Sequence, residues 1–273
     1  SLGISKVFRA HKKETSSQID LDKSMRLLMA KRILDPQSKR KSVQSQGDLF
    51  GDFDLASHSV YRALDTFSLL SEEIQLQMHQ AITKDVGRTG ALVFYDVTNY
   101  YFETDLDEES VEVKGEILPA FRKRGPSKEK RPNPIIQMGL FMDTNGIPIA
   151  YRLFPGNCVD VKTYLPAVEQ IKKQFGIERI VVVADKGMNS KDNITETLRN
   201  KDGYLFSQKV RGTRGAPKDI QAFVLDSEDW ITNEKETFAK KSMIRKRIVN
   251  KNEITEKILV TWNQKYDFRE KIR

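Results

Sequence analysis

The sequence predicts an α/β (α+β) fold, in which a mixed sheet with flanking helices follows an N-terminal helical module and precedes a mostly β insertion. Three observations predict it. Apolar residues recur at helical spacing over about the first 88 residues, short apolar runs bounded by turn residues follow from residue 91, and a helical segment separates the last two of these runs. This alternation is typical of a sheet whose strands are joined partly by hairpins and partly by a helical crossover.

The N-terminal residues predict a set of helices. In "DLDKSMRLLMAKRIL" apolar residues recur at near-helical spacing, at Leu21, Met25, Leu28, Met29 and Ile33, and Asp20 precedes them as the N-cap. "SHSVYRALDTFSLL" and "SEEIQLQMHQAI" predict two more helices, the second opened by Ser71 with an acidic first turn. Such a module can bind DNA or pack on the core, and because no recognition helix stands out, the sequence favours packing.

Strands are predicted from residue 91 onward. "ALVFYDV" is typical of a buried strand, and "NYYFET" is its predicted hairpin partner. After a polar, basic stretch from residue 105 to 134, "IIQMGLFMD" and "IPIAYRLFPG" predict two strands joined by a short turn at Thr144, Asn145 and Gly146.

A helix and one more strand complete the predicted sheet. "DVKTYLPAVEQIKKQF" predicts a helix that Asp160 caps and Gly176 ends, "RIVVVADKG" predicts a buried parallel strand, and another helix starts near Ser190. Three sequential antiparallel strands followed by a helical crossover bring the last strand back beside the first. This is the ribonuclease-H-like arrangement, and it predicts that Asp96, on the first strand, faces Asp185, at the end of the last.

Composition excludes several classes of protein. The chain has 273 residues, of which 38% are hydrophobic and 31% charged, as in globular and not in disordered proteins. No apolar run approaches the ~20 residues that span a bilayer, and no secretory signal is present. The single cysteine, Cys158, rules out a disulfide framework within the chain, so we expect a reducing compartment, the cytoplasm.

The distribution of charge favours a polyanionic partner. The formal net charge is +8 at pH 7, and basic residues gather in two blocks. The first, "RKRGPSKEKR", has Glu129 as its only acid, and the second, from Lys240 to Lys251, has none. Each block alone fits a solvated surface equally well, but two blocks that flank a candidate acidic site favour nucleic acid.

Two facing carboxylates indicate a divalent-cation site. Carboxylates a few Å apart repel each other, and one takes up a proton unless a cation meets them. Mg²⁺ and Mn²⁺ prefer carboxylate and water oxygens, and two such ions about 3.5–4 Å apart stabilise the attacking and leaving oxygens of a phosphoryl displacement. Asp96 and Asp185 are therefore candidate metal ligands, although a strand-end aspartate also occurs as a helix cap or a turn former.

Other chemistries fit the sequence poorly. The histidines, His11, His58 and His79, are scattered, and none pairs with Cys158 at zinc spacing. No histidine lies in the α/β region to activate a nucleophile, and no glycine-rich phosphate loop is present. A phosphatase with an aspartate nucleophile is disfavoured because Thr98 stands where its second aspartate is required.

Three segments match one family over about residues 90 to 210. They are "FYDVTNYYFE", the run from "KRGPSKEKRPNP" to "TYLPAVEQI", and "VVVADKGMNSKDNI". The chain resembles bacterial insertion-sequence transposases of the DDE class, and more narrowly the insertion-sequence-four group with its Tyr-Arg-Glu-Lys signature. This resemblance implies a ribonuclease-H-like catalytic core in which Asp96 and Asp185 bind two Mg²⁺ or Mn²⁺ ions. It also implies metal-dependent cleavage and strand transfer of double-stranded DNA at mobile-element ends by a homodimer, in the bacterial cytoplasm at the nucleoid and away from the membrane.

Further residues are assigned from the matched segments and the basic blocks. Thr98 shares a strand face with Asp96 and is a candidate to orient it, whereas Asn189 is expected to cap the following helix. The candidate DNA-binding residues are Lys123, Arg124, Lys128, Lys130, Lys186, Arg245 and Arg247.

The third acid of the family departs from its expected pattern. Tyr266 and Arg269 begin the signature, but Arg273 stands at the glutamate position and the chain ends there. Glu270 is the weak remaining candidate, and we expect the acid beyond this chain. The leading hypothesis is a DDE transposase, inactive as this fragment if the third acid is missing. The alternative is a catalytically inactive DNA-binding protein derived from a transposase.

The predicted domain boundaries follow from these elements. Residues 1–88 form the helical module, 89–202 the first part of the ribonuclease-H-like catalytic core, 203–262 the mostly β insertion, and 263–273 the truncated start of a C-terminal catalytic-core segment. Within the insertion, two alternating runs flank a predicted hairpin tip at residues 250–253. Because the chain opens on Ser1 and stops inside "YDFREKIR", we expect a fragment.

Overall fold

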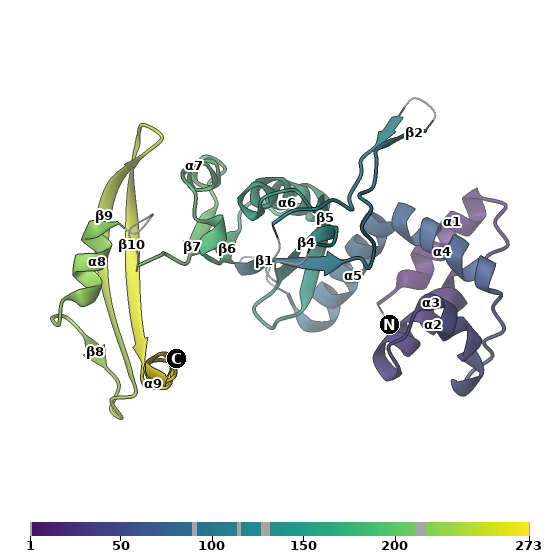
Figure 1. Ribbon diagram of the computed structural model, residues 1–273, viewed down its shortest axis with the longest axis horizontal. Coiled ribbons are helices and arrows are strands. Elements are labelled where there is room, and N and C mark those ends of the chain that lie inside the picture. Colours follow the sequence, from purple (N-terminus) through teal and green to yellow (C-terminus); the bar gives the residue numbers. More distant parts are fainter. Residues whose placement is uncertain (1, 89–91, 114–115, 127–131, 211–216, 273) are drawn as a thin grey trace. The chain divides into compact units, whose positions relative to one another are not determined.

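The chain folds into two compact units, shown in the computed structural model of Figure 1, which describes residues 2–88, 92–113, 116–126, 132–210 and 217–272. The first unit comprises Ser1–Gly90, Ile147–Ala150 and Gln170–Ile177, and the second comprises Ala91–Gly146, Tyr151–Glu169 and Glu178–Arg273. None of the helices in the part of the chain that the structure describes combines the length and apolar character needed to cross a bilayer.

The first unit is built mainly from helices. They are α1 (Ile4–Glu14), α2 (Leu21–Leu34), α3 (Lys39–Gln44), the 3₁₀ helix η1 (Gln46–Asp48), α4 (Ser57–Leu69) and α5 (Ser71–Val86). The Asp20 carboxylate accepts the backbone N–H of Lys23 at 2.8 Å, which confirms the predicted cap of α2. Ser71 is the first residue of α5, and Glu72 and Glu73 lie in its first turn, as predicted.

Two apolar clusters hold these helices together. Phe8, Leu21, Ala63 and Leu70 form one, and Leu27, Val43, Leu55 and Val60 form the other. The helical spacing of the apolar residues in α2 serves both clusters, because Leu21 packs into the first and Leu27 into the second.

A five-stranded mixed sheet lies in the second part of the chain. Its strands are β1 (Leu92–Tyr101), β4 (Ile135–Met142), β5 (Pro148–Pro155), β6 (Val181–Ala184) and β7 (Gly203–Phe206), in the order β5-β4-β1-β6-β7. Strand β1 is antiparallel to β4 and parallel to β6, which is parallel to β7. Helix α6 (Asp160–Phe175) leads into β6, and α7 (Lys191–Arg199) joins β6 to β7. The predicted α/β class and mixed sheet with flanking helices are confirmed.

The predicted hairpin partner of the first strand does not form. Residues 99–104 do not fold back as a hairpin partner, because β1 continues to Tyr101 and its ladder with β4 extends to the pair Tyr101 and Ile135. The sequence between Val97 and Asn99 contains no Gly or Pro that would reverse the chain, so the longer strand satisfies more backbone hydrogen bonds.

The remaining elements form two smaller sheets. Strands β2 (Val111–Val113) and β3 (Glu116–Leu118) form a short hairpin, and β8 (Ile231–Thr232), β9 (Phe238–Val249) and β10 (Asn252–Asn263) form a three-stranded sheet that α9 (Gln264–Ile272) follows. Helix α8 (Lys218–Leu225), absent from the prediction, precedes them. Asn250 and Lys251 join β9 to β10 with φ values of 47° and 68°, as a tight two-residue hairpin turn requires.

Two buried tyrosine hydroxyls of the second unit are each paired with a threonine. The Tyr95 hydroxyl donates to Thr163 Oγ1 at 2.8 Å, which ties β1 to α6. The Tyr164 hydroxyl lies 3.0 Å from Thr197 Oγ1 in α7, and burial raises the pKa of Tyr164 to about 12. These bonds let α6 and α7 cover the sheet without leaving buried hydroxyls unpaired.

Substitution of Gly139 on β4 tests how closely this strand packs against the Tyr95 side chain of β1. A Cβ atom at this position would lie 2.8 Å from Cε2 of Tyr95, so Gly139→Ala should destabilise the protein by about 1–3 kcal/mol in urea unfolding. Gly47→Ala is the matched control, because nothing lies within 4 Å of its Cβ position, and it should change stability by less than about 0.5 kcal/mol. Equal stabilities of the two variants would contradict this packing.

Candidate functional site

The two predicted acids lie level with each other on neighbouring strands. The parallel ladder of β1 with β6 ends at the pair Tyr95 and Ala184, and the next residues in register are Asp96 and Asp185. Paired parallel strands lie about 4.8 Å apart, and residues in register point to the same face. Tyr95 and Val97 are buried, whereas Asp96 and Asp185 are both exposed. The register therefore places Asp96 and Asp185 level with each other at the end of the β1–β6 ladder, with both residues exposed.

Asp185 also shapes the turn that follows β6. Its Oδ1 atom accepts the backbone N–H of Gly187 at 2.8 Å and caps the 3₁₀ helix η2 (Lys186–Met188). The turn-forming role is thus real, and it fixes the direction of the side chain. Because a carboxylate has two oxygens and about four lone pairs, this bond leaves capacity for a cation.

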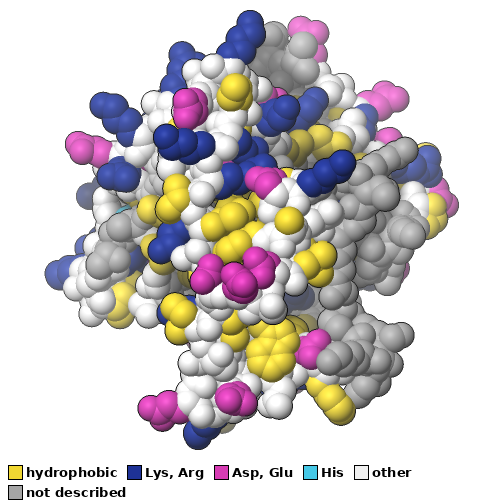
Figure 2. Space-filling model, turned by 90° about the vertical axis from the view of Figure 1, so that its left-hand side faces the viewer, with side chains coloured by type: hydrophobic (Ala, Val, Ile, Leu, Met, Phe, Trp, Pro, Cys, Tyr) yellow, Lys and Arg dark blue, Asp and Glu magenta, His cyan; other side chains and the backbone are white. Residues whose placement is uncertain are grey.

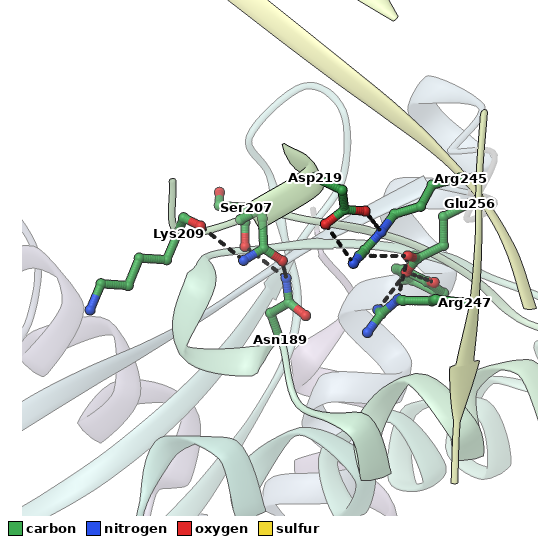
Figure 3. A network of polar contacts seen from close by, with 9 residues as sticks. Asn189, Ser207, Lys209, Asp219, Arg245, Arg247 and Glu256 are labelled. Carbon is green, nitrogen blue, oxygen red and sulfur yellow. Dashed lines mark hydrogen bonds and ion pairs between the residues drawn. The ribbon is translucent and has the colours of Figure 1, made fainter. Parts of the chain in front are cut away.

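Asn189 and Asn193 hold this turn to its neighbours. Asn189 Nδ2 donates to the carbonyl of Ser207 and to Gln208 Oε1, both at 3.1 Å, at the end of β7 (Figure 3). The predicted capping role of Asn189 is wrong, because Ser190 Oγ caps α7 by accepting the N–H of Asn193 at 3.1 Å. The buried Asn193 side chain donates to the carbonyl of Met188 at 2.9 Å.

The first basic block follows an acidic run that anchors it. Glu108 Oε2 accepts the backbone N–H groups of Phe121 at 2.8 Å and Arg122 at 3.1 Å, and these bonds lower the pKa of Glu108. Asp107 Oδ1 accepts the backbone N–H of Arg124 at 3.1 Å. The acidic residues of "ETDLDEES" therefore bind the backbone of the basic loop.

Lys123 and Arg124 are fixed differently in this loop. Lys123 exchanges two backbone hydrogen bonds with Ile135, the first residue of β4, at 3.1 and 2.9 Å. Arg124 is exposed and its guanidinium donates to the carbonyls of Pro132 at 3.2 Å and Asp105 at 2.5 Å. The loop is thus attached to the beginning of β4. Lys128 and Lys130 lie outside the described residues.

Lys186 is the predicted DNA-binding residue that the chain holds next to a candidate metal ligand. It follows Asp185 directly, opens η2 and is exposed. Figure 2 shows a face on which Lys and Arg side chains are interspersed with Asp and Glu and do not gather in one stripe. The position of each basic residue relative to the candidate acids is therefore a better guide to DNA contact than the net charge of the chain.

Arg245 and Arg247, by contrast, are paired inside the insertion. Arg247 donates to both oxygens of Glu256 at 2.5 and 2.7 Å, and Arg245 donates to both oxygens of Asp219 at 2.5 and 3.1 Å (Figure 3). Their side chains are 22% and 15% exposed. The Tyr204 hydroxyl adds a hydrogen bond of 2.6 Å to Glu256. The DNA-binding role of the two arginines stays a prediction.

Glu256 was missed by the sequence reasoning. A signal was present: along β10, Ile254, Glu256 and Ile258 point to one partly buried face, so the acid interrupts an apolar row. The register sets it across from Arg245. A charged residue in an inward position of an amphipathic strand requires a partner, and the inward-facing arginines of β9 supply it.

The structure describes only part of the region around Glu270, the candidate third acid. Glu270 lies in α9, which contacts β10, and the Glu270 side chain is outside the described part of the chain. Within the described residues no group of three or more His, Cys, Asp and Glu side chains is arranged to hold a metal ion. The candidate site therefore consists of Asp96 and Asp185 with Thr98 and Lys186 beside them.

Comparison with known families decides the class of the chain. A family model described as the transposase DDE domain matches residues 103–266, more than half of the chain. The chain belongs to this transposase DDE domain family. The match begins after Asp96 and includes Asp185, the first basic block and the β9–β10 hairpin.

Solved transposase structures are similar to this DDE-domain chain at low identity. The Mos1 transposase paired-end complex with left transposon end is 13% identical over 67% of this chain, with a TM-score of 0.28. The piggyBac transposase synaptic complex with hairpin DNA is 11% identical over 81%, with a TM-score of 0.42. The chain spans 57% of the Mos1 chain and 48% of the piggyBac chain. No curated protein matches the chain.

The Glu256 cluster predicts a pH dependence. Burial alone would raise the pKa of Glu256, but the hydrogen bonds from Arg247 and Tyr204 outweigh it and lower the pKa. A carboxyl whose pKa is lower in the folded state stabilises the fold above its ordinary pKa, near 4.5, and loses this contribution as the pH falls through the folded value. Urea unfolding followed by Trp fluorescence should therefore show stability falling below about pH 4.5.

Glu256→Gln is the control for this pH dependence. It removes the titrating carboxyl and keeps an oxygen that accepts a hydrogen bond, so its stability should depend less on pH than that of the wild type between pH 5 and 3. Parallel pH profiles of the two proteins would contradict the assignment.

Proposed function

We propose that the protein is a DNA transposase that cleaves and joins insertion-sequence ends by metal-dependent in-line phosphoryl transfer, with Asp96 and Asp185 as its first two catalytic acids. Membership of the transposase DDE domain family supports the class of reaction. The single observation that carries the assignment of the acids is the β1–β6 register, in which they are the next pair after Tyr95 and Ala184.

The residues present fit a hard divalent cation. Two exposed carboxylates on one sheet face offer the oxygen ligands that Mg²⁺ and Mn²⁺ prefer, and no thiolate or imidazole competes among the described residues beside them. Asp96 and Asp185 would hold two such ions, which when bound supply activation of the attacking oxygen and stabilisation of the leaving one. One similar solved structure is the Mos1 mariner paired end complex with Mn.

Other side chains of this region have distinct roles in the proposal. Thr98 is two residues beyond Asp96 on the same exposed face and orients that acid or a water molecule. Lys186 neutralises a phosphate of the DNA backbone next to Asp185. Glu270 is the candidate for the third acid of the set.

The finer identity is also part of the proposal. The quoted motifs favour the insertion-sequence-four group, a bacterial origin, and action as a homodimer on double-stranded DNA at mobile-element ends, in the cytoplasm at the nucleoid. The proposed domain boundaries are 1–88, 89–202, 203–262 and 263–273, and β7, at the start of the third range, is an edge strand of the five-stranded sheet.

Substitution of the two acids tests the reaction. With element-end DNA and Mn²⁺, the full-length gene product should nick the DNA, and Asp96→Asn and Asp185→Asn should each lower the rate by at least about 10³-fold, because each removes a metal-binding charge. Nicking is measured on a labelled strand. Asp52→Asn is the control, since this exposed aspartate lies in the helical unit and should leave the rate unchanged.

Two outcomes would overturn the assignment. A wild-type protein that binds element ends without nicking them would favour the catalytically inactive DNA-binding protein, and an Asp96→Asn or Asp185→Asn variant with the wild-type rate would remove that residue from the site. Mn²⁺ binding by calorimetry provides a second readout, and it should weaken in both variants.

The basic loop is tested by the salt dependence of DNA binding. Lys123→Ala should weaken binding to all sequences about equally and reduce the slope of log affinity against log salt by about 1, because one phosphate contact is lost. Its backbone bonds to Ile135 do not involve the side chain, so the loop stays attached. Lys84→Ala, in α5, is the control. A loss confined to the element-end sequence would contradict a backbone contact.

A further inference from the structure

Helix α8 and the β8–β10 sheet of the insertion are joined to the five-stranded sheet through Tyr204, a hydrogen-bond partner of Glu256. Arg245, Arg247, Glu256 and Asp219 all belong to β9, β10 or α8, so their ion pairs hold the insertion together internally. Tyr204 is different, because it lies on β7, the edge strand of the five-stranded sheet. Its 2.6 Å hydrogen bond to Glu256 therefore connects two separate sheets.

A second contact joins the tip of the hairpin to the same region. Asn250 Nδ2, in the turn between β9 and β10, donates to Asp192 Oδ1 at 3.0 Å and to Thr195 Oγ1 at 3.2 Å in α7. The hairpin is thus attached at two points, at its tip through Asn250 and further along β10 through Glu256. Two attachment points fix the direction of a long hairpin, whereas one would leave it free to rotate.

Both attachment points lie on the elements that follow Asp185 in the chain. Helix α7 begins six residues after Asp185. Strand β7 pairs directly with β6, whose last residue, Ala184, immediately precedes Asp185. Asn189 also joins the Asp185 turn to the end of β7, as Figure 3 shows. A displacement of the hairpin is therefore transmitted to the strand beside a proposed catalytic acid.

The hairpin carries exposed cations on the face opposite this cluster. Lys240 and Lys246 on β9 and Lys257 on β10 alternate with the inward arginines and are exposed. Such lysines attract the phosphate backbone without reading its sequence. Where they meet the DNA relative to Asp185 depends on how the hairpin is held.

We propose that Tyr204 is a positioning residue. Its hydroxyl holds Glu256 and thereby fixes the direction of the β9–β10 hairpin. The outward lysines of the hairpin then hold the DNA backbone in the correct position relative to the catalytic acids. Tyr204 touches no reacting atom in this assignment. The inference rests on the proposed function, since it concerns DNA held for cleavage at Asp96 and Asp185.

The hydrogen bonds to Glu256 link Tyr204 to the hairpin in a fixed geometry. Glu256 accepts from both Tyr204 and Arg247, so its lone pairs are used in several directions at once. Burial and the hydrogen bond to Glu256 raise the pKa of Tyr204, so its hydroxyl remains a donor at neutral pH. Removing the Tyr204 hydroxyl alone leaves the ion pairs of the insertion in place, which makes this substitution a selective one.

Tyr204→Phe is the direct test in the full-length protein. Because the lysines still bind DNA while its alignment is lost, kcat for Mn²⁺-dependent nicking should fall by about tenfold or more, with KM changed by less than about twofold. Hydrogen exchange should become faster in β9 and β10 and stay unchanged in β1 and β4. Tyr61→Phe, a half-exposed tyrosine of α4, is the matched control and should leave both readouts unchanged.

A second substitution separates positioning from simple stability. Glu256→Gln retains an oxygen that can accept from Tyr204, so it should lower kcat less than Glu256→Ala does. In a double-mutant cycle, Tyr204→Phe should lower kcat little further when it is added to Glu256→Ala, because the hydroxyl has already lost its partner. Independent, multiplying effects would contradict the proposal.

Different results would contradict the positioning role of Tyr204 and the proposed transposase function. A rise in KM with unchanged kcat would make the hairpin a binding element only and would overturn positioning by Tyr204. Unchanged hydrogen exchange in β9 and β10 of Tyr204→Phe would also overturn it, whether or not DNA is cut. A wild-type protein that nicks no DNA contradicts the proposed function itself.

Discussion

The parallel pairing of β1 with β6 is the constraint on which the rest of the structure depends. It joins residues that are 89 positions apart along the chain, Asp96 and Asp185, at the same level of one sheet. A shift of this pairing by one residue would send one of the two carboxyl groups to the buried face. The register is held because Val93, Tyr95 and Val182 are buried, so the apolar packing that fixes the strands also sets the acids.

Around this pair, short polar contacts fix the loops that carry the other candidate residues. Asn189 and Asn193 anchor the turn after Asp185, and Glu108 anchors the basic loop through backbone N–H groups. The acidic run that precedes this loop therefore has a structural use that its charge alone did not indicate. In a protein proposed to bind a polyanion, anchored loops limit the entropy lost when the backbone is engaged.

Side chains alternate between the two faces of β9, so the second basic block contains two kinds of basic residue. Arg245 and Arg247 point inward and pair with acids, while Lys240 and Lys246 point outward. The arginines form bidentate pairs that suit partly buried positions, and lysines are more strongly hydrated and remain exposed. Family membership supports the proposed reaction class, and the inward row of β9 supplies the arginine that pairs with Glu256, the residue that Tyr204 contacts.

The sequence by itself determined the elements with local causes. The Asp20 cap, the end of α6 at Gly176, the turn at Gly146 and the strand order that sets β6 beside β1 all follow from periodicity, turn chemistry and the crossover rule. Only the tertiary structure decided the rest. The length of β1, the placement of β7 in the main sheet and the partners of Arg247 and Asn189 depend on contacts between residues distant in the chain, and single-residue patterns carry no information about such partners.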